Sequence, residues 1–326
     1  AGGTLVTTTL TSTGNIAGAA SFLGTANQIG TIAGLTAGGP LTVVDSQALA
    51  LAGKVSASTV DITTANGGVT QGSTGTLVTG TLTSSGNIAG AASFLGTANQ
   101  IGAISNLTAI GALKVVDSVA LTLANLVSAG AGGTIDLTSS AGGVSQAAGG
   151  VLVAGTLTST GGLTGSVSLL GTSNQIASVG TIAVTAGDFT LNDSVDLLFN
   201  AGGLLSAHQI TVTDAGRTVN VASGATIKTD GIPRPAGTIP LANLPTATNN
   251  TNGGAYFTVG SFLQTGVMNV ANLNGSANIL RIDATVQTKF DATSGLNAPA
   301  TGLILGLSNG AAAGGAINVK ALDVSF

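Results

Sequence analysis

The 326-residue chain lacks several residue types on which common kinds of chemistry depend. It contains no Cys, no Trp, no Glu and a single His. The absence of Cys excludes disulfides, thiolate metal sites and Cys nucleophiles together. His208 is the only residue that could act as the base of a nucleophilic triad, and its place in a fading repeat favours a surface or turn histidine.

Charge and long apolar runs are also scarce. Charged residues make up 6% of the chain, the net charge is −4, and the eight Lys and Arg residues are scattered singly. Phosphate binding needs clustered basic residues, so nucleic acid is excluded as a partner. No uninterrupted apolar run approaches the ~18–20 residues that a membrane-spanning helix requires. We therefore expect no membrane span.

The residues that are present favour strands and turns. Apolar positions are filled by Ala, Val, Leu and Ile, and Thr, Ser, Asn and 51 Gly residues supply most of the remainder. β-Branched residues separated by Gly, Asn and Ser are typical of strands joined by tight turns. The composition predicts an all-β protein.

An internal repeat is the strongest signal in the sequence. Residues 3–30 (GTLVTTTLTSTGNIAGAASFLGTANQIG) and 75–102 differ at only two of 28 positions, and a third copy spans 152–177. The second half of the unit also recurs, as STVDITTANGGVTQ at 58–71 and GTIDLTSSAGGVSQ at 133–146. The repeat units lie near 3–74, 75–149 and 150–225.

The repeat unit, which separates Asn27 from Asn99, is too long for one turn of a solenoid. We expect about four rungs of roughly 18–20 residues each, in a right-handed parallel β-helix. In STVDITT, Val60 and Ile62 alternate with polar residues, as in strands that are buried on one face. The AGG and NGG sequences supply the positive φ angles that tight corners need. A β-propeller and tandem sandwiches are the alternatives, and the missing aromatic landmarks and large core residues disfavour them.

The sequence predicts three regions. Residues 1–230 form the repeat array, and because it starts in mid-unit we expect either preceding coils or an edge that docks on a neighbour. Residues 231–254 hold four of the six prolines and are predicted to be a Pro/Asn-rich linker. Residues 255–326 are predicted to be a small β module, a cap, or a continuation of the helix with longer rungs.

The repeat resembles a known family. GTLTSSGNIAGAASFLGTANQIG, followed by VVDSVALTL and TIDLTSSAGGVSQ, is similar to the repeat region of filamentous-haemagglutinin-like bacterial exoproteins. The similarity covers roughly residues 1–225, and the C-terminal stretch is similar to segments that follow such arrays. The resemblance implies a right-handed β-helix, extracellular display and a role in adhesion or in a biofilm matrix. It does not extend to the secretion domain of that family, so it does not predict the export route.

The polar residues that recur once per unit are the candidate site residues. Since Asn and Asp side chains bond nearby backbone N–H groups, we expect these positions to be structural turn formers. They are Asn27, Asn99, Asn174, Asp45, Asp117 and Asp193. Asp61 and Asp136 are a second such pair. No catalytic residue, cofactor or metal site is predicted.

Two other groups of residues have an alternative interpretation. Asp188, Asp193, Asp196 and Asp214 could form the acidic cluster of a polysaccharide-cleaving β-helix enzyme, although a structural role is favoured. The aromatic group of Tyr256, Phe257 and Phe262 could form a carbohydrate platform, although core packing is favoured.

The sequence thus predicts a non-enzymatic extracellular structural protein, a rigid β-helical surface fibre or adhesin that is secreted or displayed on a bacterial cell surface. Its expected partners are a host or neighbouring-cell surface or the extracellular matrix. The alternative is a subunit that stacks end to end on copies of itself into a filament or matrix. A glycan-acting enzyme is a distant third.

Overall fold

The computed structural model describes residues 3–229, 254–264, 267–270, 279–291, 296–297, 303–307 and 316–320. These residues form strands and turns, and none of them is helical. Within the described ranges, no helix is therefore long and apolar enough to cross a membrane. The prediction of an all-β fold is confirmed.

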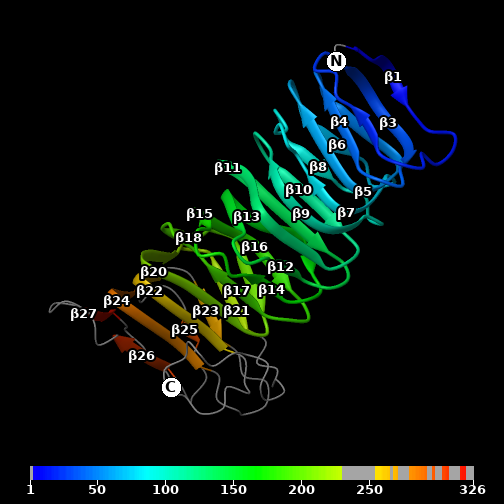
Figure 1. The fold of residues 1–326 in the computed structure, drawn as a ribbon. Helices are drawn as coiled ribbons and strands as arrows, with labels where there is room; N and C mark the ends of the chain where they lie inside the picture. Colours follow the sequence, from blue (N-terminus) through cyan, green and yellow to red (C-terminus); the bar gives the residue numbers. More distant parts are fainter. Residues whose placement is uncertain are drawn as a thin grey trace. The chain divides into compact units, whose positions relative to one another are not determined.

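The chain divides into two compact units, residues 1–178 and 179–326, which we call unit 1 and unit 2. Unit 1 is a stack of parallel strands (Figure 1). Its strands are β1 (Val6–Leu10), β2 (Ala20–Phe22), β3 (Gln28–Thr36), β4 (Leu41–Asp45), β5 (Leu49–Thr64), β6 (Val69–Gln71), β7 (Thr76–Thr83), β8 (Ala92–Phe94), β9 (Gln100–Thr108), β10 (Leu113–Asp117), β11 (Leu121–Ser139), β12 (Val144–Gln146), β13 (Val151–Leu163), β14 (Val167–Leu169) and β15 (Gln175–Ile176).

Unit 2 is built in the same way. Its strands are β16 (Ser178–Val184), which begins at the boundary, β17 (Phe189–Asn192), β18 (Leu197–Phe199), β19 (Leu204–Ala207), β20 (Ile210–Val221), β21 (Thr226–Thr229), β22 (Gly254–Gln264), β23 (Val267–Val270), β24 (Ile279–Asp291), β25 (Leu296–Asn297), β26 (Leu303–Leu307) and β27 (Ala316–Lys320).

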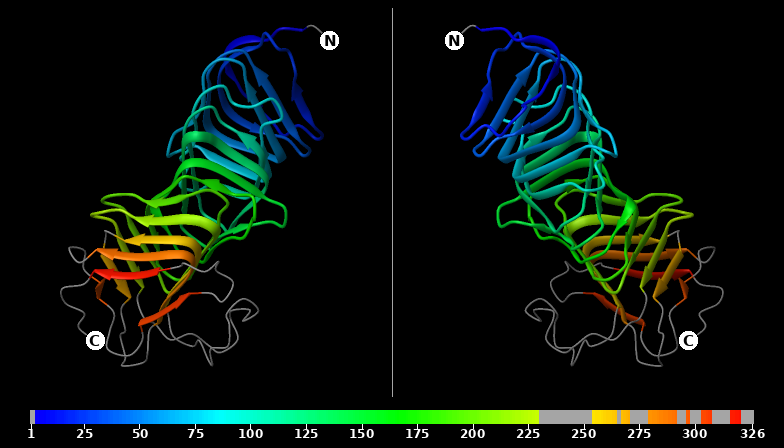
Figure 2. Two further views of the ribbon diagram at one scale, coloured as in Figure 1. Left: turned by 90° about the vertical axis from the view of Figure 1, so that its left-hand side faces the viewer. Right: turned by 90° about the vertical axis from the view of Figure 1, so that its right-hand side faces the viewer.

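Each turn of the chain hydrogen-bonds to the next along the stacking direction. In unit 1, Leu41 is the parallel partner of Val60, and Leu113 is the parallel partner of Ile135. The two views of Figure 2 show the strands of unit 1 stacked in this way on more than one face. This is a β-solenoid, consistent with a right-handed parallel β-helix, the hand that parallel crossover connections nearly always take.

Most rungs are somewhat longer than the sequence predicts. Thr31 and its parallel partner Ala50 are separated by a turn of the predicted length, whereas Leu126 and its partner Val151 are separated by a longer one. The extra residues lie at corners, where the register shifts. Because the rungs are longer, fewer of them fit into one repeat unit, and the prediction of about four rungs per unit is wrong.

The register shows how far one unit travels around the solenoid. The backbone N–H of Ser46 donates to the carbonyl of Asn27 at 2.8 Å, one rung on. Its neighbour Asp45 pairs with Thr64, and Thr64 pairs with Ile88. This column of stacked residues has then risen three rungs from Asn27.

Asn99, the next copy of Asn27, lies about half a rung beyond Ile88 along the chain. The repeat unit therefore spans about three and a half rungs, and successive copies alternate between two opposite sides of unit 1. The column continues from Ala109 through Ser128 and Val153 to Gln175, the neighbour of Asn174. The third copy thus returns to the side of the first.

The core is made of ladders of inward-facing aliphatic residues. One ladder runs through Leu49, Val69, Ala92, Leu113 and Ile135, which are all at most 1% exposed. The side chains between them face outward, as the period of two predicts. Burial of each such side chain contributes about 1.5–3 kcal/mol for the larger residues.

The predicted positive φ angles are found at the Gly-Gly corners of residues 67–68 and 142–143, but not at residues 38–39 or 132–133. At the first two corners the two glycines have different roles. Gly67 and Gly142 have φ angles of 83° and 90°, which a residue with a side chain rarely adopts. At the following glycines, Gly68 and Gly143, an added Cβ would lie 2.0 Å from a backbone oxygen of the neighbouring rung. Small residues here are a condition for rung stacking.

In unit 2 the strands after the Pro-rich segment continue the parallel stacking. Ile210 of β20 pairs with Ala255 of β22, and Phe257 of β22 pairs with Ile282 of β24. This arrangement favours the prediction of a continued helix over a separate β module. Residues 231–253 of the predicted linker lie outside the described residues, so that the domain boundary there stays a prediction.

Candidate functional site

The repeated asparagines are buried corner residues that hydrogen-bond to neighbouring rungs. Asn27, Asn99 and Asn174 are at most 2% exposed. Their Oδ1 atoms accept hydrogen bonds of 2.7–2.8 Å from backbone N–H groups 22 residues earlier. In the first two copies, Nδ2 donates at 3.0 Å to a backbone carbonyl 17 residues later, that of Val44 or Val116. Asn27 and Asn99 therefore connect their own rung to the rungs on either side.

A glutamine amide completes two of these corners, and the sequence analysis missed it. Gln71 Nε2 donates to Asn99 Oδ1 and Asn99 Nδ2 donates to Gln71 Oε1, both at 2.9 Å. Gln146 and Asn174 form the same reciprocal pair at 2.7 and 3.1 Å. The signal was available, because GGVTQ and GGVSQ each end 28 residues before an asparagine of the repeat.

The repeated aspartates of unit 1 satisfy backbone donors at the same corners. Asp45 accepts from the N–H groups of Ile29 at 3.2 Å and Ser46 at 2.8 Å. Asp117 accepts from those of Ile101 at 3.1 Å and Ser118 at 2.9 Å. Their assignment as structural turn formers agrees with these bonds.

Burial perturbs the ionisation of both carboxyls. Asp45 and Asp117 are 0% exposed. Loss of hydration raises the pKa of Asp45, and raises that of Asp117 to about 6, although the backbone N–H donors act in the opposite direction. The Oδ2 atom of Asp117 has no hydrogen-bond partner among the residues that the structure describes.

Asp61 and Asp136, the second predicted pair, also accept hydrogen bonds from backbone N–H groups of the next rung. Asp61 accepts from the N–H of Ser85 at 2.8 Å. Asp136 accepts from the N–H of Thr160 at 2.9 Å and from its hydroxyl at 2.7 Å. All three bonds span 24 residues, so these carboxylates hold the start of the following turn.

The acidic residues of unit 2 come together only in part. Asp193 and Asp214 are inward-facing residues on adjacent rungs, 7% and 0% exposed, and the N–H of Asp193 donates to the carbonyl of Thr213 at 2.8 Å. Asp196 is exposed and accepts from the N–H of Thr218 at 2.9 Å. Within the described ranges, no three Asp, Glu, His or Cys residues are placed to hold a metal ion.

The aromatic residues lie in the core of unit 2. Tyr256, Phe257 and Phe262 are at most 6% exposed. The ring of Phe257 lies 4.9 Å from that of Phe262 and 6.4 Å from that of Phe199, centroid to centroid. Core packing therefore uses these rings, and they do not form an exposed platform for sugars. His208 is half-buried just before β20.

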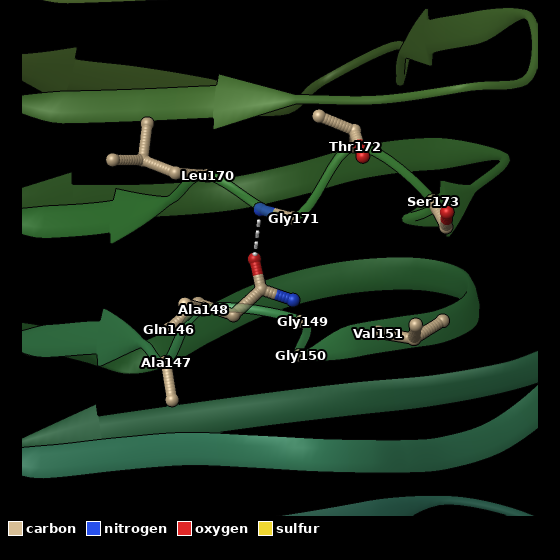
Figure 3. Close-up of a pocket in the computed structure, with 10 residues that line it drawn as sticks. All are labelled: Gln146, Ala147, Ala148, Gly149, Gly150, Val151, Leu170, Gly171, Thr172 and Ser173. Atoms are coloured by element: carbon tan, nitrogen blue, oxygen red, sulfur yellow. Dashed lines mark hydrogen bonds between the residues drawn. The ribbon is translucent and has the colours of Figure 1, made fainter.

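The surface of unit 1 has a shallow depression of about 370 Å³ between two stacked turns (Figure 3). The lower turn runs from Gln146 to Val151 and the upper turn from Leu170 to Ser173. Gln146 Oε1 accepts from the N–H of Gly171 at 2.7 Å and ties the turns together. The lining offers hydroxyls, backbone groups, the Gln146 amide and several apolar side chains, and it carries no charge.

A leucine beside this turn recurs in every copy and is solvent-exposed, which the sequence analysis also missed. Leu23, Leu95 and Leu170 are 59%, 36% and 52% exposed. Each precedes a glycine packed so tightly that an added Cβ would lie within 2.3 Å of a carbonyl oxygen one rung away. Because the unit spans three and a half rungs, these leucines alternate between opposite sides of unit 1.

The class that the fold defines is the parallel β-solenoid. Comparison with family models, with curated proteins and with solved structures finds no match. The likeness to filamentous-haemagglutinin-like exoproteins therefore stays a prediction from the sequence.

Proposed function

We propose that this chain is a non-enzymatic structural segment of a bacterial surface fibre or adhesin, displayed outside the cell. One observation carries the proposal: in unit 1, the polar residues that recur once per repeat are buried and hydrogen-bonded to neighbouring rungs. Their recurrence is explained by what a rigid stack of turns requires. The proposal assigns these residues to mechanical stability.

The bonding pattern suits a load-bearing role. In a solenoid each turn contacts only its neighbours, and stability is a sum over the interfaces between turns. Asn99 links its own turn to Leu77 on one side and Val116 on the other, in addition to the strand ladders. Such corners resist separation of the turns at the point where the chain reverses.

The exposed leucines are the contacts that we assign to a partner surface. Leu23, Leu95 and Leu170 stand on a surface with few charges, where apolar contacts meet little electrostatic opposition. Their alternation presents similar contacts to two sides. The proposed partners are a host or neighbouring-cell surface or an extracellular matrix, and the resemblance of the repeat to bacterial exoproteins supports this choice.

The adhesin proposal is tested with beads coated with the full chain and incubated with host cells and bacterial cells. We expect adhesion that falls at least several-fold when Leu23, Leu95 and Leu170 are all replaced by Ser. The control is Ile110→Ser, a comparably exposed residue (65%) that does not recur in the repeat. Equal adhesion of the triple variant and the control would show that the three leucines are not the contact residues. If the natural chain gives no adhesion to any cell, the adhesin function is wrong.

Electron microscopy of the purified chain distinguishes the proposed adhesin segment from the alternative, a subunit that assembles into filaments. Discrete particles that do not grow with concentration support a segment of a fibre or adhesin. Continuous fibrils would instead favour a self-assembling filament or matrix subunit. Release of reducing ends from an acidic polysaccharide, lost in Asp193→Ala, would overturn the non-enzymatic assignment.

A further inference from the structure

Unit 2 buries two carboxyl groups next to each other. Asp193 follows β17 and Asp214 lies in β20, and the register places them on adjacent rungs at the same inward column. Asp214 is 0% exposed, and neither of its carboxyl oxygens has a hydrogen-bond partner among the described residues. In this respect Asp214 differs from Asp45 and Asp117, whose carboxylates accept two backbone N–H groups each. Asp193 is 7% exposed.

Charges of both signs act on Asp214. Asp196, in the turn after β17, adds a third carboxylate, and Arg217 in β20 is the cation that acts on Asp214. The neighbouring strand β22 carries no Asp, Glu, Lys, Arg or His. Asp188 and His208 lie at the opposite end of β17 and β20, and Lys228 lies in β21.

Two adjacent buried carboxyl groups cannot both ionise at low cost, because each charge loses its hydration and repels the other. We propose that the Asp193–Asp214 pair is a pH-sensitive element, which stabilises unit 2 while it holds a proton and loosens the corner when both groups ionise. The inference is independent of the proposed function. It makes unit 2 most stable in acidic surroundings.

The direction of the effect follows from linkage. Burial, and then the charges of Asp193 and Asp196, raise the pKa of Asp214 from 3.8 to about 7, and Arg217 lowers it. An unfolded chain releases this proton near pH 3.8, whereas the folded unit keeps it until about pH 7. The stabilisation is therefore complete below pH 3.8 and is lost as the pH rises to about 7. The unfolding equilibrium constant of unit 2 should rise up to about a thousandfold over this range.

The chain carries a built-in probe for this unit. Tyr256 in β22 is the only Tyr of the sequence, which has no Trp, and it is buried beside β20. Its fluorescence during urea unfolding of the full chain therefore reports on unit 2 without a signal from unit 1. We expect the urea midpoint to fall between pH 4.5 and about pH 7 and to change little from there to pH 8.

Three variants test the assignment. Asp214→Asn should give a midpoint that is nearly independent of pH and higher than that of the natural chain at pH 8. If this variant does not fold, Asp193→Asn should shift the pH dependence to lower pH, because it removes the neighbouring charge that raises the pKa of Asp214. Asp196→Asn, at the exposed carboxylate, should keep the full pH dependence with at most a small shift.

Two results would overturn the proposal. One is a midpoint for the natural chain that is the same at pH 4.5 and pH 8, and the other is an unchanged pH dependence in both Asp214→Asn and Asp193→Asn. Each pH is also measured with Ca²⁺ and with a chelator. If Ca²⁺ stabilises unit 2 at pH 8 and Asp214→Asn abolishes this effect, the pair binds a cation and the proton-dependent proposal is overturned.

Discussion

Replacement of Asn99 by Ala should destabilise the rungs around it by about 3–5 kcal/mol, because its truncation leaves two or three buried polar groups without partners. Asn99 is 0% exposed and bonds to the N–H of Leu77, the carbonyl of Val116 and both ends of the Gln71 amide. Each orphaned group costs about 1–3 kcal/mol, and the cavity adds to this.

Hydrogen exchange of the full chain, followed by mass spectrometry, measures this effect locally, because a long solenoid need not unfold in a single step. We expect lost protection in β7, β9 and β10 in Asn99→Ala. The matched control is Asn66→Ala, since Asn66 is exposed and donates one bond of 3.3 Å to the carbonyl of Ser46. The control should cost less than about 1 kcal/mol.

The Gln71–Asn99 amide pair allows a second test at this corner. If the amide pair acts as a unit, Gln71→Ala and Asn99→Ala together should cost less than the sum of the two single changes. Equal protection in Asn99→Ala and Asn66→Ala would refute the claim that the repeated asparagine fastens the rungs. Strict additivity with Gln71→Ala would refute the pairing alone.

Three more outcomes are expected from thermal and urea unfolding. Ile62→Asp places an unpaired charge at a site that is 1% exposed and should unfold several rungs. Thr63 faces outward, so Thr63→Asp should have only a mild effect. Similar melting curves for the two variants would show that the inward and outward faces are assigned wrongly. Gly96→Ala puts a Cβ 2.1 Å from a backbone oxygen, whereas at Gly72 no atom lies within 4 Å of an added Cβ. Gly96→Ala should therefore lower the free energy of unfolding several times as much as Gly72→Ala. Equal losses would count against tight stacking at this turn. Asp117 should make unit 1 lose up to about 3 kcal/mol as the pH rises from 3.8 to about 6, because the folded state keeps a proton that the unfolded chain releases. Asp117→Asn should reduce the slope of a pH series and leave the contribution of Asp45, whose pKa is also raised by burial.

The parallel solenoid was predictable because its requirements are local. Alternation such as that of Val60 and Ile62 reports which side of a strand is buried, and the Gly-Gly corners at Gly67 and Gly142 report where the chain must turn. The structural role of Asn27, Asn99 and Asp117 could be predicted for the same reason.

What the sequence alone determined is the class of fold, the inward side of each strand and the turn residues, since these depend on the preferences of single residues and their nearest neighbours. The length of each rung was decided in three dimensions, because the loops at the corners set it. That length makes the repeat three and a half rungs long, and so decides which residues meet. The pairing of Gln71 with Asn99 and of Asp193 with Asp214 follows from the stacking of successive turns, which brings together residues that lie far apart in the chain.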